Sequence, residues 1–273
     1  MSSFYCQILF ITVLSTVLCT SDAYYYCDKQ KDICGPNEHF MCNFETVPRG
    51  GDLMHLAPMT NKLKRLVVDN HNKYRNILAS GEQVFGKENK KFPKATRMRE
   101  VLWDDELAYI AEKHAARCHM MHDKCHSTER FPFSGQNLYI IGGTKMFTDI
   151  DFRIVQSIDL WWAECELVGD GISLVEKFPG SEDFHATGHF TAMANERAAF
   201  VGCGAALCQN CTSGKYCLEI SCNYSLTNMH GTYMYKAGDS SASECDYFET
   251  TPSVKYPHLC INTGNLFTLE KFH

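Results

Sequence analysis

Apolar residues recur at helical spacing in three segments of the first part of the chain. Segment 60–79 ends before a Ser-Gly pair, and segment 104–118 begins with aspartates that can cap a helix. A third apolar stripe runs over 148–167 and contains the consecutive tryptophans Trp161 and Trp162. The pattern predicts a helix in each segment. Because neighbouring helical positions point in different directions, we expect one indole ring in the core and the other partly exposed.

The second part of the chain changes to short, strand-like apolar runs. These runs lie at 189–194, 199–206 and 216–224. Helices that precede strands, without alternating strand–helix units, favour an α+β domain. Residues 24–58 carry three cysteines among Gly, Pro and Asn and show no helical period. We therefore expect an irregular, disulfide-held segment before the first helix.

The first 23 residues predict a signal peptide. An apolar run from Ile8 to Cys19 is followed by Thr20-Ser21-Asp22-Ala23, whose small residues suit a cleavage site. The run is too short to span a bilayer, and no later apolar run is long enough to do so. The sequence thus predicts a secreted, extracellular protein.

The cysteine content agrees with secretion. The chain has 15 cysteines, and loss of Cys6 and Cys19 with the signal peptide leaves 13. In an oxidising compartment this density predicts a disulfide framework. The odd number leaves at least one thiol that is free, capped or bonded to another chain, so a disulfide-linked dimer is one outcome. Cys208, Cys211 and Cys217 suit a zinc knuckle, a redox pair or local disulfides, and secretion favours local disulfides.

Two N-glycosylation sequons also fit a secreted chain. Asn210 precedes Cys211-Thr212 in a polar loop, where we expect a glycan. Asn223 precedes Tyr224-Ser225 inside a predicted strand, where modification is less expected.

Charge and motif content exclude some classes of function. The net charge of −6 is spread along the chain without a basic stripe, which excludes a typical nucleic-acid binder. No serine or cysteine stands in a nucleophile elbow or a Cys/His signature, so no nucleophilic hydrolase is indicated.

Four local motifs occur in a recognisable order over residues 60–235. They are Leu102-Trp103-Asp104-Asp105-Glu106-Leu107-Ala108, Gly188-His189-Phe190-Thr191-Ala192-Met193, Val201-Gly202-Cys203-Gly204 and Ile220-Ser221-Cys222-Asn223-Tyr224. Together they resemble the signatures of the CAP family (cysteine-rich secretory protein, antigen 5, pathogenesis-related 1). The segments 118–125, 134–138 and 245–260 are similar to those of the insect antigen 5, or venom allergen-like, branch.

The resemblance implies a three-layer α-β-α sandwich. With it, the chain divides into four expected regions: a signal peptide at 1–23, a lead-in at 24–59, a CAP domain at 60–237 and a disulfide-closed tail at 238–273. The implied disulfides are Cys27–Cys42, Cys34–Cys125, Cys203–Cys222 and Cys245–Cys260. The lead-in lacks the cysteine that pairs with Cys118 in the family. No pairing is therefore implied for Cys118, Cys165, Cys208, Cys211 and Cys217.

The resemblance also implies a central cleft lined by His122, Gln136, Glu164 and His189. Two neutral imidazoles can ligate Zn²⁺ or Cu²⁺, and nearby carboxylates can orient the rings. Gln136 stands where the family has an acid, which removes one negative charge and a candidate base. His126 is an alternative ligand. Three interpretations stay open: structural bracing, reversible metal binding at His122 and His189, and catalysis.

The resemblance favours a secreted, non-enzymatic binding protein without a required cofactor. Similar proteins occur in insect venom, saliva and male reproductive fluid, and their partners are extracellular proteins, receptors or small ligands. One alternative is a carrier of a hydrophobic ligand such as a sterol, fatty acid or eicosanoid. Another is a metal-dependent enzyme that uses His122, Glu164 and His189.

Overall fold

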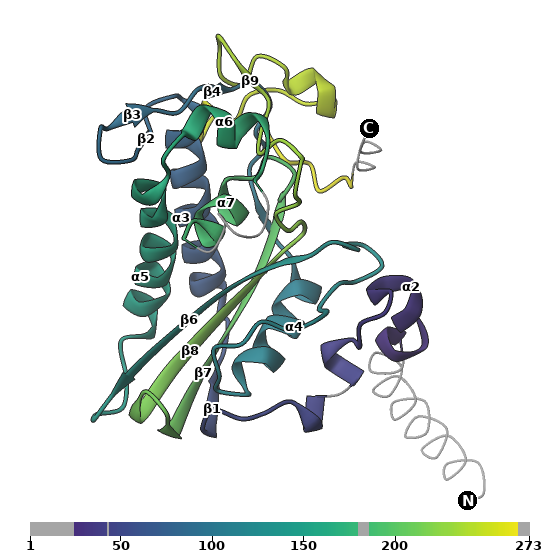
Figure 1. The fold of residues 1–273 in the computed structure, drawn as a ribbon, viewed down its shortest axis with the longest axis vertical. Coiled ribbons are helices and arrows are strands. Elements are labelled where there is room, and N and C mark those ends of the chain that lie inside the picture. Colours follow the sequence, from purple (N-terminus) through teal and green to yellow (C-terminus); the bar gives the residue numbers. More distant parts are fainter. Residues whose placement is uncertain (1–24, 43, 180–185, 267–273) are drawn as a thin grey trace, which may run out of the picture. The chain divides into compact units, whose positions relative to one another are not determined.

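The computed structural model describes residues 25–42, 44–179 and 186–266, so the predicted signal peptide lies outside the described residues (Figure 1). The chain divides into two compact units. The smaller contains residues up to 47 together with 123–132, and the larger contains 48–122 and 133 onward. No helix in the described ranges is long and apolar enough to cross a membrane.

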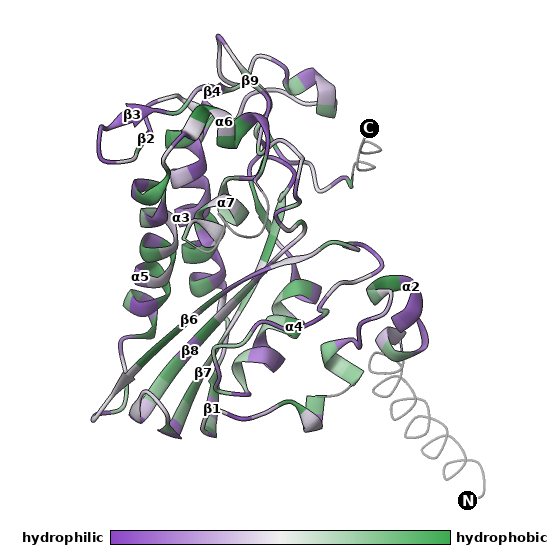
Figure 2. Cartoon of the chain, in the orientation of Figure 1, coloured by the Kyte–Doolittle hydropathy of each residue, from purple (hydrophilic) through white to green (hydrophobic). Residues whose placement is uncertain are grey.

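The larger unit is built on a five-stranded sheet. Its strands are β1 (Asp52–Ala57), β5 (Leu102–Trp103), β6 (Gly135–Gly143), β7 (Phe200–Cys211) and β8 (Gly214–Tyr224). The order is β1-β7-β8-β6 with antiparallel neighbours, and the short β5 pairs in parallel with the start of β7. Figure 2 shows hydrophobic residues along the central β7–β8 hairpin, as expected for strands covered on both faces.

Helices cover both faces of this sheet. They are α3 (Asn61–Ala79), α4 (Asp105–Ala115), α5 (Ile150–Ala163), α6 (Gly171–Glu176) and α7 (Gly188–Ala194). Helix α4 packs on one face of β7 and β8, whereas α3, α5 and α7 lie on the other (Figure 1). The larger unit is therefore the three-layer α-β-α sandwich of an α+β protein.

The three helices predicted from apolar spacing are confirmed, and two of them begin at capping side chains. The Thr60 side chain accepts a hydrogen bond from the Leu63 amide at 3.3 Å. The Asp104 carboxylate accepts one from the Leu107 amide at 2.9 Å. Each contact satisfies an amide that has no partner within its helix.

The strand predicted at 189–194 is wrong, because this segment forms α7. The first amides of α7 are capped by a side chain that is distant in the sequence. The Glu164 carboxylate accepts hydrogen bonds from the His189 and Phe190 amides at 2.9 and 3.1 Å. A short apolar run does not itself distinguish a helix from a strand.

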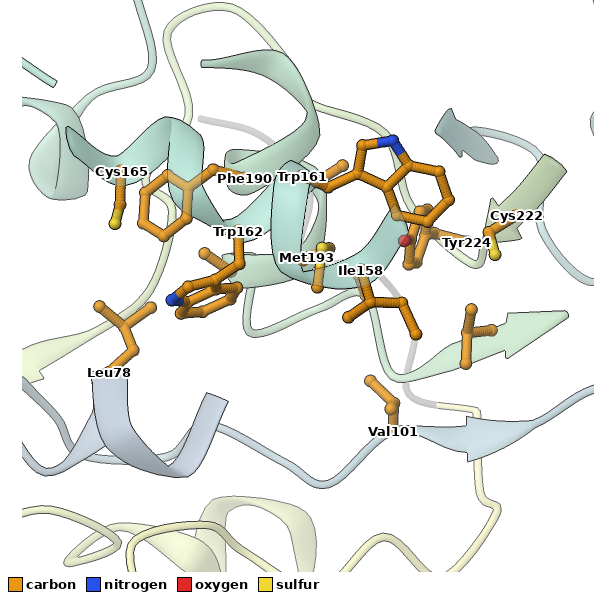
Figure 3. Packing of buried hydrophobic residues seen from close by; sticks show 14 of the residues in the cluster. Leu78, Val101, Ile158, Trp161, Trp162, Cys165, Phe190, Met193, Cys222 and Tyr224 are labelled. Atoms are coloured by element: carbon orange, nitrogen blue, oxygen red, sulfur yellow. The ribbon is translucent and has the colours of Figure 1, made fainter. Parts of the chain in front are cut away.

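Both tryptophans of α5 are buried, which corrects the expectation that one would be partly exposed. Each indole N–H has an acceptor: Trp161 donates to the Leu138 carbonyl at 3.0 Å and Trp162 to the Gln83 side chain at 2.9 Å. Figure 3 shows both rings within the main core beside Phe190 and Met193. Because α5 packs against both α3 and α7, its buried arc is wide enough for two adjacent positions.

Residues 48–57 do not belong to an irregular lead-in. They enter the larger unit, where β1 pairs with β7 from Asp52↔Gln209 to Ala57↔Ala205. The described part of the smaller unit contains helical turns rather than purely irregular chain. These are α2 (Gln30–Cys34), η1 (Phe40–Cys42) and η2 (Phe44–Thr46).

The remaining elements of the larger unit are short. They are β2 (Val84–Phe85), β3 (Lys90–Lys91), β4 (Lys94–Ala95), β9 (Ala237–Gly238), η3 (Glu164–Leu167) and η4 (Cys245–Phe248). The β2–β3 pair forms a hairpin, and β4–β9 joins the C-terminal tail to the segment after α3.

Six disulfides join twelve of the cysteines in the described part of the chain. The pairs are Cys27–Cys42, Cys34–Cys125, Cys118–Cys208, Cys203–Cys222, Cys211–Cys217 and Cys245–Cys260. Cys165 is the free cysteine among the described residues, and it is buried. Burial raises the pKa of its thiol to about 11. Pairing of Cys118 and burial of Cys165 argue against an interchain disulfide through either residue.

Candidate functional site

Glu164 and His189 form a tight pair between the end of α5 and the start of α7. His189 Nδ1 lies 2.6 Å from Glu164 Oε1. An ionised carboxylate only accepts hydrogen bonds, so Nδ1 carries the proton and the lone pair of the neutral ring is on Nε2. The other carboxylate oxygen accepts from the His189 and Phe190 amides. Three donors thus fix Glu164, which orients the imidazole as carboxylates do behind metal-binding histidines.

His122 and Gln136 form the second pair. His122 Nδ1 lies 3.0 Å from Gln136 Oε1, and the amide oxygen can only accept, so the proton is again on Nδ1. The two residues differ in exposure: His122 is exposed and Gln136, near the start of β6, is buried. The His122 ring therefore carries its proton on the same nitrogen as the His189 ring, but its partner is an amide and not a carboxylate.

Asn137 connects the two pairs. It follows Gln136 in β6 and is buried. Its side-chain amide donates to the His189 carbonyl at 3.1 Å and to the Tyr224 hydroxyl at 3.2 Å. The Tyr224 oxygen lies 3.0 Å from His71 Nε2, and His71 Nδ1 lies 2.8 Å from the Val67 carbonyl. A buried polar chain thus runs from α3 through β8 and β6 to the start of α7.

Sequence reasoning did not identify this buried series of hydrogen-bonded side chains as part of the site. Asn137 and Tyr224 lie in recognised motifs, yet nothing in the motifs says that their side chains meet. His71 and Tyr224 are both fully buried. Burial lowers the pKa of His71 to about 4, and the Arg75 guanidinium adds to that effect. The detectable signal was a histidine among the core-facing positions of a helix.

The four predicted residues provide at most two imidazole ligands. A metal would take Nε2 of His122 and of His189, since Nδ1 of each ring is already hydrogen-bonded. The Glu164 carboxylate contacts the His189 ring and also accepts hydrogen bonds from two backbone amides. The alternative ligand, His126, lies in the smaller unit.

One group of three histidine and cysteine side chains in the described ranges has all its ligand atoms within 4.8 Å of one another. It contains Cys34, His39 and Cys125. The two cysteines form a disulfide, so their sulfurs are not thiolates and this group does not fit a metal. His39 instead lies 2.8 Å from the Ser127 carbonyl and accepts from the Met41 amide at 3.1 Å.

The two sequons differ in accessibility. Asn210 is exposed near the end of β7, where its amide donates to Asp52 at 2.8 Å. Asn223 is fully buried in β8 and donates to the Leu107 carbonyl. Glycan attachment is therefore sterically compatible with Asn210 but not with Asn223 in the folded protein.

Comparison with known proteins agrees with this architecture. The model of the cysteine-rich secretory protein family matches residues 68–224. This chain belongs to the CAP family. The CAP relative "Venom allergen-1" of Aedes albopictus is 33% identical over 92% of each chain. "Antigen 5 like allergen Cul n 1" of Culicoides nubeculosus is 36% identical over 70% of this chain and 83% of that protein.

Solved structures share the CAP fold at lower identity. "Structure of BmVAL-1" has a TM-score of 0.61 at 22% identity and covers 79% of this chain and 98% of its own. "Crystal structure of NaASP2 with Zn2+" has a TM-score of 0.58 at 23% identity and covers 74% and 96%. The insect venom allergen and antigen 5 relatives place this chain in that branch of the CAP family.

Proposed function

We propose that this protein is a secreted, non-enzymatic CAP protein that acts by binding an extracellular protein. The observation that carries the proposal is a set of exposed apolar side chains on α5 and the segments that follow it. Phe152 and Leu160 on α5, Leu167 at the end of η3 and Ile172 on α6 are each more than half exposed. We call these four side chains the α5 surface. Exposed apolar side chains gathered along one region are typical of interaction sites.

The charges beside the α5 surface favour a particular kind of partner. Asp159, Glu166 and Asp170 are exposed among its members. A second copy of the chain would bring these carboxylates together, which is unfavourable. A partner segment with apolar side chains and flanking lysines or arginines complements both features. We therefore propose a partner that presents a basic, apolar segment.

The chemistry of the cleft supports a binding protein over an enzyme. Gln136 is an amide and cannot act as a base, and the Glu164 carboxylate already accepts three hydrogen bonds. An ideal general base has an available lone pair near the reacting proton. Secretion is supported by the six disulfides, which persist in oxidising compartments.

A peptide library displayed on phage tests the α5 surface directly, because selection from random peptides does not require the partner to be identified first. We expect the protein to select peptides that combine apolar and basic residues. The variant Phe152→Ser/Leu160→Ser should bind a selected peptide at least about tenfold more weakly, because it loses two apolar contacts. Val254→Ser is the matched control, since Val254 is almost fully exposed but lies in the tail.

Equal peptide affinity in the wild type and the Phe152→Ser/Leu160→Ser variant would contradict the proposal. So would selection of acidic peptides. Native mass spectrometry of the purified protein addresses the carrier alternative, because a mass excess that organic solvent extracts would indicate a bound hydrophobic ligand.

Reversible zinc binding is a second candidate function, supported by the hydrogen bond that Nδ1 makes in both His122 and His189. We expect weak binding of Zn²⁺ in calorimetric titrations and its loss in His189→Ala. Gln136→Glu should tighten binding by about tenfold, because a carboxylate partner makes the His122 ring a better ligand. His126→Ala should change nothing. Unchanged affinity in Gln136→Glu, or loss in His126→Ala, would argue against this pair of ligands.

A further inference from the structure

Four cysteines gather where the end of α4 meets the tip of the β7–β8 hairpin. Cys118, just after α4, is bonded to Cys208 of β7. Cys211 at the end of β7 is bonded to Cys217 of β8. Three of the four are buried in one apolar cluster, and Cys211 is partly buried against it. The two disulfides are therefore neighbours within the same packed region.

The register of the hairpin places one cysteine of each disulfide directly opposite the other. Cys208 and Cys217 are partners in the β7–β8 ladder. Side chains of directly opposite residues point to the same face, with Cβ atoms about 4.5 to 5.5 Å apart. Cys203 and Cys222 are also opposite each other in this ladder, and they form a disulfide. A bridge between Cys208 and Cys217 would therefore require the strands to approach by only about 1 Å.

The other two cysteines lie beside one pair of glycines. A Cβ added to Gly50 would lie 2.1 Å from the carbonyl oxygen of Cys118. A Cβ added to Gly51 would lie 3.0 Å from Cys211 Sγ. The Gly50 carbonyl also accepts a hydrogen bond from the Thr212 amide at 3.3 Å. The end of α4 and the end of β7 thus contact the same two residues, which brings Cys118 and Cys211 close enough for an alternative second bridge.

We infer that these two disulfides exchange partners in the folded protein and form a thiol-sensitive switch. The co-reactant is a small thiol such as glutathione. Its thiolate attacks Cys211 Sγ, because Cys211 is the one residue of the four that is not fully buried. The bond to Cys217 breaks, and the Cys217 thiolate is released opposite Cys208.

Two further displacements complete the exchange. The Cys217 thiolate attacks Cys208 Sγ and releases the Cys118 thiolate. Cys118 then attacks Cys211 Sγ, which releases the small thiol. Two protein disulfides are lost and two are formed, so the oxidation state of the protein is unchanged and the small thiol is regenerated.

Exchange would move the covalent attachment of the segment after α4. This segment is bonded to Cys208, whereas the alternative pairing attaches it to Cys211, about 10 Å farther along β7. His122 lies four residues after Cys118 and is hydrogen-bonded to Gln136. The position of the His122–Gln136 pair would therefore respond to thiols around the protein. The switch goes beyond the proposed function, since none of its residues belongs to the α5 surface.

Cys211→Ala tests the central step without an added thiol, because it leaves Cys217 as a thiol opposite the Cys118–Cys208 bond. The variant is incubated at slightly alkaline pH, quenched with acid and alkylated after denaturation, and the labelled peptides are identified by mass spectrometry. We expect the label to divide between Cys217 and Cys118, with at least about one chain in ten labelled at Cys118. Label at Cys217 without any at Cys118 would overturn the inference.

Cys245→Ala is the matched control for a cysteine that has lost its partner. The remaining Cys260 lies in a separate cluster that contains no second disulfide among the described residues. We expect Cys260 to keep its label. The free Cys165 contributes the same label to every sample.

Two double variants test the alternative bridge by itself. Cys118→Ala/Cys211→Ala leaves Cys208 and Cys217, which should form a disulfide. Cys118→Ala/Cys217→Ala leaves Cys208 and Cys211, whose Cα atoms are about 10 Å apart along one strand and cannot be bridged. The second variant should therefore show two more thiols than the first. Equal numbers of thiols in the two variants would contradict the inference.

The wild-type protein provides a test that needs no substitution. It is incubated with a trace of glutathione under native conditions, and its pairing is read by electron-transfer fragmentation, which cleaves the backbone between Cys208 and Cys211. We expect the Cys208–Cys217 linkage to appear with glutathione and to be absent without it. Retention of the Cys118–Cys208 and Cys211–Cys217 pairs alone after prolonged incubation would overturn the inference, and it would leave the α5 surface unaffected.

Discussion

Gly204→Ala is expected to lower the free energy of unfolding by about 3 kcal/mol or more. An added Cβ at Gly204 would lie 2.2 Å from Glu112 Cα and 2.4 Å from Glu112 N. Both atoms belong to the backbone of α4, so no side-chain rotation can relieve the overlap. The helix would have to move away from β7. Because α4 leads into the loop that carries Met120 and His122, the same shift would displace that loop.

Denaturant unfolding with the disulfides intact measures this effect. Gly169→Ala is the matched control, because an added Cβ there meets nothing within 4 Å. The control should be neutral or stabilised by up to about 1 kcal/mol, since alanine restricts the unfolded chain. If Gly204→Ala is as stable as Gly169→Ala, α4 does not lie directly on β7.

The contact of α4 with Gly204 of β7 is an example of a feature that the sequence could not predict. Helical spacing predicted α3, α4 and α5, because each buries one stripe of apolar residues. It offered no sign that α4 rests on glycines of β7, since a glycine leaves no hydrophobic signal. Strand β1 was missed for a related reason: its first four residues are exposed, so no alternation of apolar and polar positions marks it.

In the candidate site, too, some features could be predicted from the sequence and others could not. The motifs placed His122, Gln136, Glu164 and His189 in the sequence, and the structure shows two hydrogen-bonded pairs, His122 with Gln136 and Glu164 with His189. The partner of Cys118 could not be predicted, because it depends on the register of β7, which brings Cys208 to the end of α4. The expectation of local disulfides was correct for Cys211–Cys217 but not for Cys208. Pairing across elements is decided by tertiary packing, which a single sequence does not display.

Acid should destabilise the larger unit through His71. This imidazole is fully buried, and its pKa in the folded protein is about 4. In the unfolded chain the value is about 6.5, so the unfolded state binds the proton first as the pH falls. Stability is therefore complete above about pH 6.5 and decreases toward pH 4. The loss approaches about 1.4 kcal/mol per pH unit and about 3 kcal/mol in total.

The groups that face His71 are consistent with a lowered pKa of its imidazole. The Tyr224 hydroxyl and the Val67 carbonyl occupy its two nitrogens, and the Arg75 guanidinium disfavours a second positive charge. Protonation would place a proton on Nε2, where Tyr224 now lies, and Asn137 already donates to the same hydroxyl. The buried chain that reaches His189 therefore depends on a neutral His71.

Tryptophan fluorescence follows the unfolding of the larger unit separately from that of the smaller unit. All three tryptophans, at positions 103, 161 and 162, belong to the larger unit. Their signal thus excludes His39, whose pKa is also lowered by burial but which lies in the smaller unit. We expect urea unfolding between pH 7 and pH 4 to show a clear loss of stability in the wild type and a flatter profile in His71→Gln. His55→Gln, which alters an exposed imidazole on β1, should retain the wild-type profile. An unchanged slope in His71→Gln would show that the acid sensitivity arises elsewhere in the larger unit.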